Sequence, residues 1–508
     1  MYLKEEHTIW MATGDGPVYL SPAMANRHGL IAGATGTGKT VTLKVFAESF
    51  SDMGVPVFLA DVKGDVSGMA LPGEMNKHIQ KSIDTMQLKD FTFTGYPVRL
   101  FDVYGKLGHP VRTTISEMGP DLLGHLLELN DTQSGILRIV FRIADDRGLL
   151  LLDLKDLRSM VQYVGDHAAE FKTEYGNVST QSVGSIQRAL LHLEDEGGNV
   201  FFGEPALDIG DWMQCDTDGR GFLNVLECQE LFQHPLLYAT FLLWMLSDLY
   251  ERLPEAGDLD KPKMIFCFDE AHLLFRDAPK SLVEKVEQIV RLIRSKGIGV
   301  YFITQQPADI PDAVLAQLGN RIQHALRAYT PAEQKNLKAA ASAFRANPAF
   351  DCATVLPELG TGEVLISLLD EDGVPTVVQR ANILPPRSGL GAADAATMER
   401  LVKQSPLAAK YDKAVDRESA YEKLDEEAQE EAKAAAAAEK EAAEEAAREK
   451  AEKEARQAEK EARQAARAAA PRAPKKTALE RTVDNTLSTV GRELGRQLVR
   501  GLFGNLRK

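Results

Sequence analysis

Short apolar runs alternate with amphipathic segments near the start of the chain. Gly29–Ala32 is an apolar run of strand length, and after a glycine-rich loop a helical repeat of apolar residues continues to Gly54. Val55–Ala60 is the next apolar run, and it ends at Asp61. A strand, a helix and a strand within about 35 residues predict a βαβ unit and therefore a parallel sheet.

The same alternation returns after residue 260. The pattern there predicts a helix at Ser281–Ser295 and strands at Met264–Phe268, Gly299–Thr304, Arg321–Tyr329, Glu363–Leu369 and Thr376–Arg380, the last two forming a hairpin. Residues 1–61 and 261–384 are therefore interpreted as the two parts of one α/β core, a parallel sheet flanked by helices.

Residues 62–260 interrupt this pattern. Apolar spacing predicts strands at Val98–Val103 and Gly221–Glu227 and helices at Ile115–Leu129, Thr132–Ala144, Leu154–Phe171 and Val183–Leu193. A mostly helical insertion packed on the sheet and a separate helical domain both fit this pattern. The apolar run Pro235–Ser247 is shorter than the ~20 residues of a membrane span, so it predicts a buried core helix. Without a signal-like N-terminus, a cytoplasmic protein is expected.

The composition changes after Leu384. Prolines and glycines predict a linker over residues 385–427. Residues 428–470 contain 20 alanines among 43 residues, interleaved with charges, which predict a long solvated helix. That helix has no apolar seam, which disfavours a coiled coil. Residues 471–508 have nine Lys and Arg against three acids, a local charge of +6, and their apolar repeat predicts a basic amphipathic tail. Such a tail would dock on a protein partner, a membrane surface or DNA.

The overall charge limits the possible partners. The chain has 508 residues, 44% of them hydrophobic, and a formal net charge of −15. A basic coat over the whole protein is excluded, so contact with nucleic acid would have to be local. The four cysteines show no CxxC spacing, which argues against a disulfide framework or a cysteine zinc site.

The glycine-rich loop is the sharpest candidate site. The phosphate-binding pattern G-x-x-x-x-G-K-[ST] is matched in full by Gly33, Ala34, Thr35, Gly36, Thr37, Gly38, Lys39 and Thr40. Backbone N–H groups of this loop and of Val41, at the start of the predicted helix, are expected to surround the phosphates of ATP. Lys39 would reach the β- and γ-phosphates, and the Thr40 hydroxyl would hold Mg²⁺.

A second candidate lies in Met264–His272, where an apolar strand ends in two acids. Following a phosphate-binding loop, this is a Walker B arrangement, in which Asp269 would hold Mg²⁺ and Glu270 would polarise the attacking water. A second acid fits attack by water better than transfer to a small acceptor. His272 is interpreted as structural.

Two further candidates flank the predicted strand that ends at Thr304. Gln305, with Gln306 as second choice, would sense the γ-phosphate or orient the water; capping of the strand end is the other interpretation. Before the strand, Arg291, Arg294 and Lys296 form a basic group. An arginine at a subunit boundary acts as a finger on a neighbour's γ-phosphate, whereas a surface salt bridge at a helix C-terminus is the simpler interpretation.

Together these segments resemble the HerA–FtsK group of P-loop ATPases, most closely the bacterial HerA-like family with its YjgR-type members. The resemblance covers roughly residues 20–385 and rests on RHGLIAGATGTGKT, FLADVKGD, FCFDEAH, IRSKGIGVYFITQQPADIP and LGNRIQHALRAYTPAEQK. It implies a RecA-like sheet whose sensor strand lies between the P-loop and Walker B strands, with Gln305 beside Lys39 and Glu270. It also implies a finger at Arg294, with Arg321 and Arg327 as fallback candidates, and hexameric rings that pull DNA or sometimes protein.

The resulting hypothesis is a homo-oligomeric, Mg²⁺-dependent ATPase that translocates duplex DNA. The alternative is a nucleotide-gated assembly protein without motor activity, in which ATP binding switches assembly and the basic C-terminal helix recruits a partner. Stimulation of ATP turnover by DNA discriminates between the two.

Overall fold

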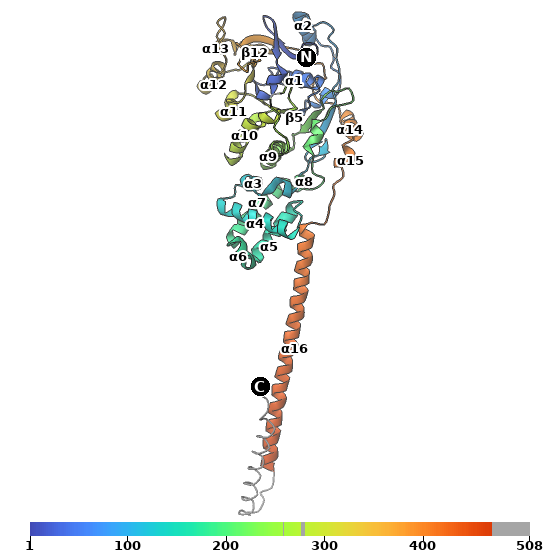
Figure 1. Cartoon of the computed structure of the whole chain (residues 1–508), viewed down its shortest axis with the longest axis vertical. Helices are drawn as coiled ribbons and strands as arrows, with labels where there is room; N and C mark the ends of the chain where they lie inside the picture. The colour runs from blue at the N-terminus through green and yellow to red at the C-terminus, as the bar shows by residue number, and fades with distance from the viewer. Residues whose placement is uncertain (258, 276–279, 470–508) are drawn as a thin grey trace, which may run out of the picture. The chain divides into compact units, whose positions relative to one another are not determined.

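The computed structural model describes residues 1–257, 259–275 and 280–469 (Figure 1). The chain divides into two compact units, Met1–Glu426 and a second that begins at Glu427. The helix α16 (Ala420–Ala469) is continuous and begins before the predicted residue 428. The predicted basic tail, residues 471–508, lies outside the described residues.

The first unit is built on a single mixed sheet. Its described strands are β1 (Tyr2–Leu3), β2 (Thr8–Thr13), β3 (Pro17–Leu20), β4 (Gly29–Ala32), β5 (Val57–Asp61), β6 (Val98–Asp102), β7 (His109–Pro110), β8 (Leu223–Glu227), β9 (Met264–Phe268), β10 (Ile298–Thr304), β11 (Asn320–His324), β12 (Glu363–Ser367) and β13 (Gln379–Ile383). The strand order is β1-β2-β13-β12-β11-β4-β10-β9-β5-β8-β6-β7, with β3 also paired to β2. From β11 to β7 all neighbours run parallel, whereas β12, β13, β2, β1 and β3 add an antiparallel edge.

Helices cover both faces of this sheet. The α-helices of the first unit are α1 (Lys39–Asp52), α2 (Lys77–Met86), α3 (Ile115–Leu126), α4 (Asp131–Arg147), α5 (Leu154–Asp166), α6 (Ala168–Tyr175), α7 (Thr180–Asp195), α8 (Gly198–Phe201), α9 (Pro235–Arg252), α10 (Lys280–Ile293), α11 (Asp312–Leu315), α12 (Pro331–Ser342), α13 (Cys352–Val355), α14 (Ala395–Gln404) and α15 (Ala408–Tyr411). The 3₁₀ helices are η1 (Pro22–Arg27), η2 (Ser67–Ala70), η3 (Ile209–Met213), η4 (Leu231–Gln233), η5 (Ala271–Leu274), η6 (Arg294–Lys296) and η7 (Pro307–Asp309).

Side chains alternate between the two faces along the central strands, as the period of a strand requires. Phe58 and Phe266 join a core with α3, α4, α5, α7, α9 and α10, whereas Leu59 and Ile265 join a second core with α1. The strands are apolar on both faces because both faces are covered, which is the usual state of a parallel sheet.

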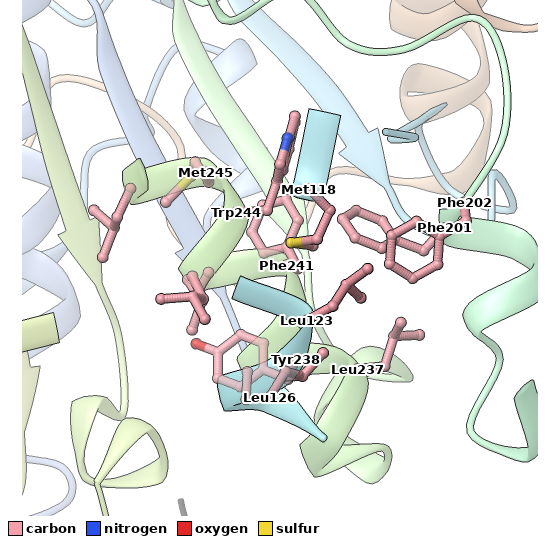
Figure 2. Close-up of a cluster of buried hydrophobic side chains, with 14 of the residues drawn as sticks. Met118, Leu123, Leu126, Phe201, Phe202, Leu237, Tyr238, Phe241, Trp244 and Met245 are labelled. Atoms are coloured by element: carbon pink, nitrogen blue, oxygen red, sulfur yellow. The ribbon is translucent and has the colours of Figure 1, made fainter. Parts of the chain in front are cut away.

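The segment 62–260 is attached to the sheet in two ways. It contributes β6 and β8, which pair in parallel with each other and, through β8, with β5. Its helices α3 to α7 gather at one end of the unit (Figure 1). Figure 2 shows how α3 is joined to α9. Met118, Leu123 and Leu126 of α3 face Phe241 and neighbouring residues of α9 in one buried cluster.

The apolar run Pro235–Ser247 lies within α9, which is buried along almost its whole length, as predicted for a core helix. No helix in the described part of the chain is both long and apolar enough to span a membrane.

Several element predictions differ from the structure. The predicted helix Leu154–Phe171 is two helices, α5 and α6, which meet at His167. The predicted strand Arg321–Tyr329 ends at His324, where the chain turns to the phosphate-binding loop and the Ala325 carbonyl accepts the Ala34 N–H. Strands β1 to β3 were not predicted, because polar and apolar residues are mixed before Gly29 and form no continuous apolar run.

Residues 385–419, here called the strap, were predicted as part of a linker but contain α14 and α15 and are anchored along their length. The Glu48 carboxylate of α1 accepts the backbone N–H groups of Arg387 and Ser388, both at 2.9 Å. Lys44 Nζ of the same helix donates to the Gly389 carbonyl at 2.8 Å. At the far end, the Ser419 hydroxyl donates to the Asp156 carboxylate of α5. The strap therefore ties the helix after the phosphate-binding loop to the helical segment.

Candidate nucleotide-binding site

The phosphate-binding loop connects β4 to α1. Gly38 caps α1 with φ 109°, and Gly33 has φ 154°, conformations that side-chain-bearing residues rarely adopt. A Cβ atom on Gly33 would lie 2.4 Å from the Cβ of His324, so the close approach of β11 also requires glycine there. The sequence pattern predicted both the loop and the helix that follows it.

Lys39 is buried within this loop, with 5% of its surface exposed. Its Nζ donates to the carbonyls of Gly33 at 2.6 Å and Ala34 at 3.1 Å. Burial and the charge of Lys63 lower the pKa of Lys39, and the carboxylates of the Walker B pair oppose that shift. The ammonium group is thus held at the centre of the loop by backbone oxygens, within the electrostatic reach of both acids.

The Walker B pair follows β9. Asp269 and Glu270 are 4% and 8% exposed, and the Glu270 N–H donates to Asp269 Oδ1 at 2.9 Å. The Glu270 backbone lies in the left-handed region, with φ 48° and ψ 46°, which costs about 1–2 kcal/mol for an L-residue. Strained backbone of this kind concentrates at functional sites.

The strand order places the predicted sensor beside these acids. β10 lies between β4 and β9, as the resemblance implied, and ends immediately before Gln305. Gln305 Nε2 donates to Glu270 Oε2 at 3.3 Å. Gln306, the second choice, points instead to α12, where its Oε1 accepts from Asn336 at 3.0 Å. Gln305 is therefore the glutamine that the structure brings to the Walker B pair.

His272 also lies next to the pair, with its Nδ1 3.3 Å from Glu270 Oε2. It borders an open hollow of about 800 Å³ that Gln305, Gln306 and Asp309 also line. The hollow therefore opens beside Gln305 and His272, the two residues that lie next to Glu270.

Two residues that sequence reasoning did not single out complete the site. Lys63, after β5, places its Nζ 2.8 Å from Glu270 Oε1 and 3.2 Å from Asp269 Oδ2. His324, at the end of β11, lies behind the phosphate-binding loop. Both occur in the quoted strings FLADVKGD and LGNRIQHALRAYTPAEQK, and each follows or ends a strand of the central sheet, which was the available signal.

His324 links the loop to the first turns of α1. The Thr37 carbonyl can only accept, so His324 Nδ1 donates to it at 3.0 Å, and Nε2 accepts from the Thr42 hydroxyl at 2.8 Å. Burial lowers the pKa of His324 to about 4, so the ring is neutral near pH 7. A neutral ring supplies the one donor and one acceptor that these partners need.

The candidate finger arginines occupy different places. Arg294 lies in η6, before β10, and Gln305 follows the other end of that seven-residue strand, about 23 Å away. Arg321 donates to the carbonyls of Leu318 and Leu315, both at 3.1 Å, and is committed to its own subunit. Arg327 donates to the carbonyls of Pro357 and Leu359.

The residues present fit ATP and Mg²⁺. The loop offers backbone N–H groups at a helix N-terminus, where phosphate is stabilised. Thr40 and Asp269 offer a hydroxyl and a carboxylate, and Mg²⁺ is commonly held by one or two carboxylates together with phosphate oxygens and water. With the parallel sheet, the phosphate-binding loop and the Walker B pair, the fold and site define a P-loop ATPase of the RecA-like class.

The chain belongs to the helicase HerA-like C-terminal family, whose model matches residues 6–508. It is 22% identical over 361 residues to the DNA double-strand break repair helicase HerA of Sulfolobus acidocaldarius, covering 67% of this chain and 62% of that protein. A probable helicase of Methanocaldococcus jannaschii is 27% identical over 125 residues, covering 24% of this chain and 22% of the relative. The chain therefore spans less than two thirds of the length of these relatives.

Among solved structures, the plasmid coupling protein TrwB in complex with a non-hydrolysable GTP analogue is similar, with a TM-score of 0.49 and 12% identity over 76% of this chain and 92% of that chain. VirB4 of Thermoanaerobacter pseudethanolicus gives a TM-score of 0.45 and 15% identity over 74% of this chain and 96% of that chain.

Proposed function

We propose that this protein hydrolyses ATP with Mg²⁺ and acts, as a ring of identical subunits, as a motor on duplex DNA. The observation that carries the hydrolytic part is the convergence of three strand ends. The strands β4, β10 and β9 are parallel neighbours, and their carboxyl ends lie side by side. They are followed by the loop with Lys39, by Gln305 and by the two acids, in that order.

Each residue has a distinct task in this proposal. The loop N–H groups and Lys39 bind the phosphates, while Thr40 and Asp269 would hold Mg²⁺. When bound, Mg²⁺ neutralises charge on the phosphate oxygens. Glu270 accepts a proton from the attacking water at a carboxylate oxygen, and Gln305 fixes the orientation of that carboxylate through the 3.3 Å hydrogen bond.

The environment of Glu270 supports its role as a base. Burial acts to raise its pKa, but hydrogen bonding from Lys63 and the Lys63 charge, with a smaller contribution from Gln305, lower that pKa below its ordinary value. Glu270 is therefore ionised near pH 7 and able to accept a proton.

The ring and DNA parts rest on other observations. Family membership and the similarity to an archaeal DNA repair helicase support a DNA motor. Arg294 lies at the opposite end of β10 from its own site, so as a finger it would act only on the site of a neighbouring subunit. In this proposal, the active sites would therefore lie at subunit boundaries.

Steady-state ATP turnover, with and without linear duplex DNA, tests this proposal. Glu270→Gln should lower kcat about 100-fold or more while ATP still binds, because the base is lost. Glu230→Gln, a change at an exposed surface acid, is the matched control and should match wild type. Wild-type turnover in Glu270→Gln would remove Glu270 as the base, and turnover indifferent to DNA would favour the nucleotide-gated assembly protein.

Mixing two inactive variants tests the finger. Arg294→Ala should be inactive but bind ATP, and adding Glu270→Gln subunits should restore part of the turnover. Restoration is expected because an Arg294→Ala site with an intact Glu270 would receive a finger from its Glu270→Gln neighbour. Mixtures that stay inactive, although both variants assemble, would contradict a finger supplied in trans.

A further inference from the structure

Lys63 is held in place by a loop of defined geometry. The Asp61 carboxylate at the end of β5 is fully buried and accepts the backbone N–H groups of Gly64 at 2.8 Å, Asp65 at 3.3 Å and Val66 at 2.8 Å. The carbonyl of Lys63 itself accepts from Gln229 Nε2 at 2.9 Å. These bonds fix the turn after β5, so Lys63 is presented to the site by its backbone.

The ammonium group of Lys63 bridges the two Walker B acids. Its side chain is 36% exposed, whereas the side chains of Asp269 and Glu270 are 5% and 10% exposed. Of the two donors to Glu270, Lys63 is the nearer at 2.8 Å and Gln305 lies at 3.3 Å. Lys39 is bonded to loop carbonyls instead, so the two lysines have separate partners.

The two contacts of Lys63 have different chemical consequences. Asp269 Oδ1 accepts the Glu270 N–H, whereas Oδ2, the oxygen that Lys63 contacts, accepts from no backbone group and is the freer of the two for a metal ion. A Mg²⁺ ion held by this oxygen would compete with the Lys63 ammonium group for it, because both are attracted by its charge. The Glu270 contact is made to Oε1, leaving Gln305 on Oε2, so it fixes the carboxylate from a second side.

We propose that Lys63 is a positioning residue for the Walker B pair, which orients the Glu270 carboxylate and competes with Mg²⁺ for Asp269. With Asp269 holding the metal, Lys63 would keep its contact with Glu270 alone. This inference rests on the proposed ATPase function and adds a residue to its machinery. Lys63 links the arrival of the metal to the orientation of the base.

Four forms of the full-length protein test this inference: wild type, Lys63→Met, Lys63→Arg and Lys106→Met. Lys106 is a matched control, because its Nζ also pairs with a carboxylate, at 2.6 Å from Glu230, but on the exposed surface. Mn²⁺ binding in the presence of ADP is measured by electron paramagnetic resonance, and ATP turnover is measured separately. Circular dichroism establishes that each variant is folded.

Lys63→Met should bind Mn²⁺ about threefold or more tightly than wild type, because the competing charge is removed. Its kcat should fall about tenfold, with a much smaller change in KM, because the base is less well oriented. Lys63→Arg keeps the charge and should bind Mn²⁺ as wild type does, and Lys106→Met should match wild type in both assays.

Unchanged or weaker Mn²⁺ binding in folded Lys63→Met would overturn the competition. A kcat equal to or above that of wild type, or a rise in KM alone, would overturn the positioning role. If wild type has no turnover, the proposed ATPase function fails, and the Mn²⁺ measurement still decides whether Lys63 competes for Asp269.

Discussion

At the scale of single residues, the phosphate-binding loop depends on a partner from outside the loop. The imidazole of His324 binds both the Thr37 carbonyl, which also accepts the Gly362 N–H, and the Thr42 hydroxyl, at 3.0 and 2.8 Å, and is completely buried. A buried polar group that loses its partner costs about 1–3 kcal/mol. His324 therefore contributes to the shape of the loop, although it is not part of the phosphate-binding motif.

His324→Ala should lower the free energy of unfolding by about 1–3 kcal/mol and weaken ATP binding, because the Thr42 hydroxyl loses its short hydrogen bond and the Thr37 carbonyl keeps only the Gly362 N–H. Urea unfolding and binding of a fluorescent ATP analogue measure the two effects. His78→Ala, at an exposed position of α2, is the control. Full affinity in a folded His324→Ala protein would show that the loop keeps its shape without the imidazole.

The contrast between these residues shows what a sequence can reveal about a site. Lys39, Asp269 and Glu270 belong to short motifs whose chemistry depends on local spacing, so they were predictable from a single segment. His324 lies 287 positions from Thr37, and Lys63 lies 206 positions from Asp269. Their contacts form only when β11 and β5 pair in the sheet, so the spacing of residues along the chain does not predict them.

At the scale of elements, three neighbouring parallel strands end in buried acids. Asp61 ends β5, Glu227 ends β8 opposite Asp61, and Asp102 ends β6. Asp61 and Asp102 accept backbone N–H groups of the following turns, whereas Oε1 of Glu227 has no partner. Burial, with the charges of Asp61 and Asp102, raises the pKa of Glu227 to about 8.

This raised pKa predicts a pH-dependent stability. Between pH ~4.5 and 8 the folded chain keeps the Glu227 proton that the unfolded chain releases, so the free energy of unfolding falls as the pH rises. Glu227→Gln removes this dependence. The free energy of unfolding of the variant, relative to wild type, should therefore rise by up to about 3 kcal/mol from pH 5.5 to pH 8. Urea unfolding at both pH values measures the gain, with Glu230→Gln as the control.

An equal effect of Glu227→Gln at pH 5.5 and 8 would mean that Glu227 is ionised in the folded protein throughout. A gain that appears in Glu230→Gln as well would assign the pH dependence to the general charge of the chain.

The predictability of the elements follows their local patterns. The central strands β4, β5, β9 and β10 are buried on both faces and were predicted as apolar runs. Strands β1 to β3 lie on the antiparallel edge, where β2 alternates between buried and half-buried residues and β3 between buried and exposed ones. Their pairing with β13, near the other end of the first unit, is a tertiary event, and the isolated segment gives only a weak strand signal.

At the scale of the whole molecule, the strap decides where the first unit ends. The contacts of Glu48 and Lys44 of α1 with residues 387–391 bury two charged groups of the helix that carries the phosphate-binding loop. Contacts of Tyr411 with Asp211 and of Ser419 with Asp156 extend the same connection to the helical segment. Residues 385–426 are therefore part of the ATPase unit, although their composition resembles a linker.

Two truncations test this boundary. A fragment of residues 1–426 should unfold in urea at a midpoint close to that of the same unit in the full chain. A fragment of residues 1–384 should be less stable by about 3–5 kcal/mol, because the hydrogen bonds of Glu48 and Lys44 to residues 387–389 and the packing of the strap are lost. Fragments of equal stability would show that the strap is dispensable, and equal loss in both would place the boundary beyond residue 426.

The strap also has a consequence for how the chain folds during synthesis. Helix α1 is complete at Asp52, but the N–H group that binds Glu48 belongs to a residue 339 positions later. At roughly 5–20 residues per second, a ribosome needs roughly 17–70 s to cover that interval. Throughout this time, Glu48 and Lys44 are hydrated by water instead of bound to the strap, so the native burial of α1 is completed only after residues 387–389 have been made.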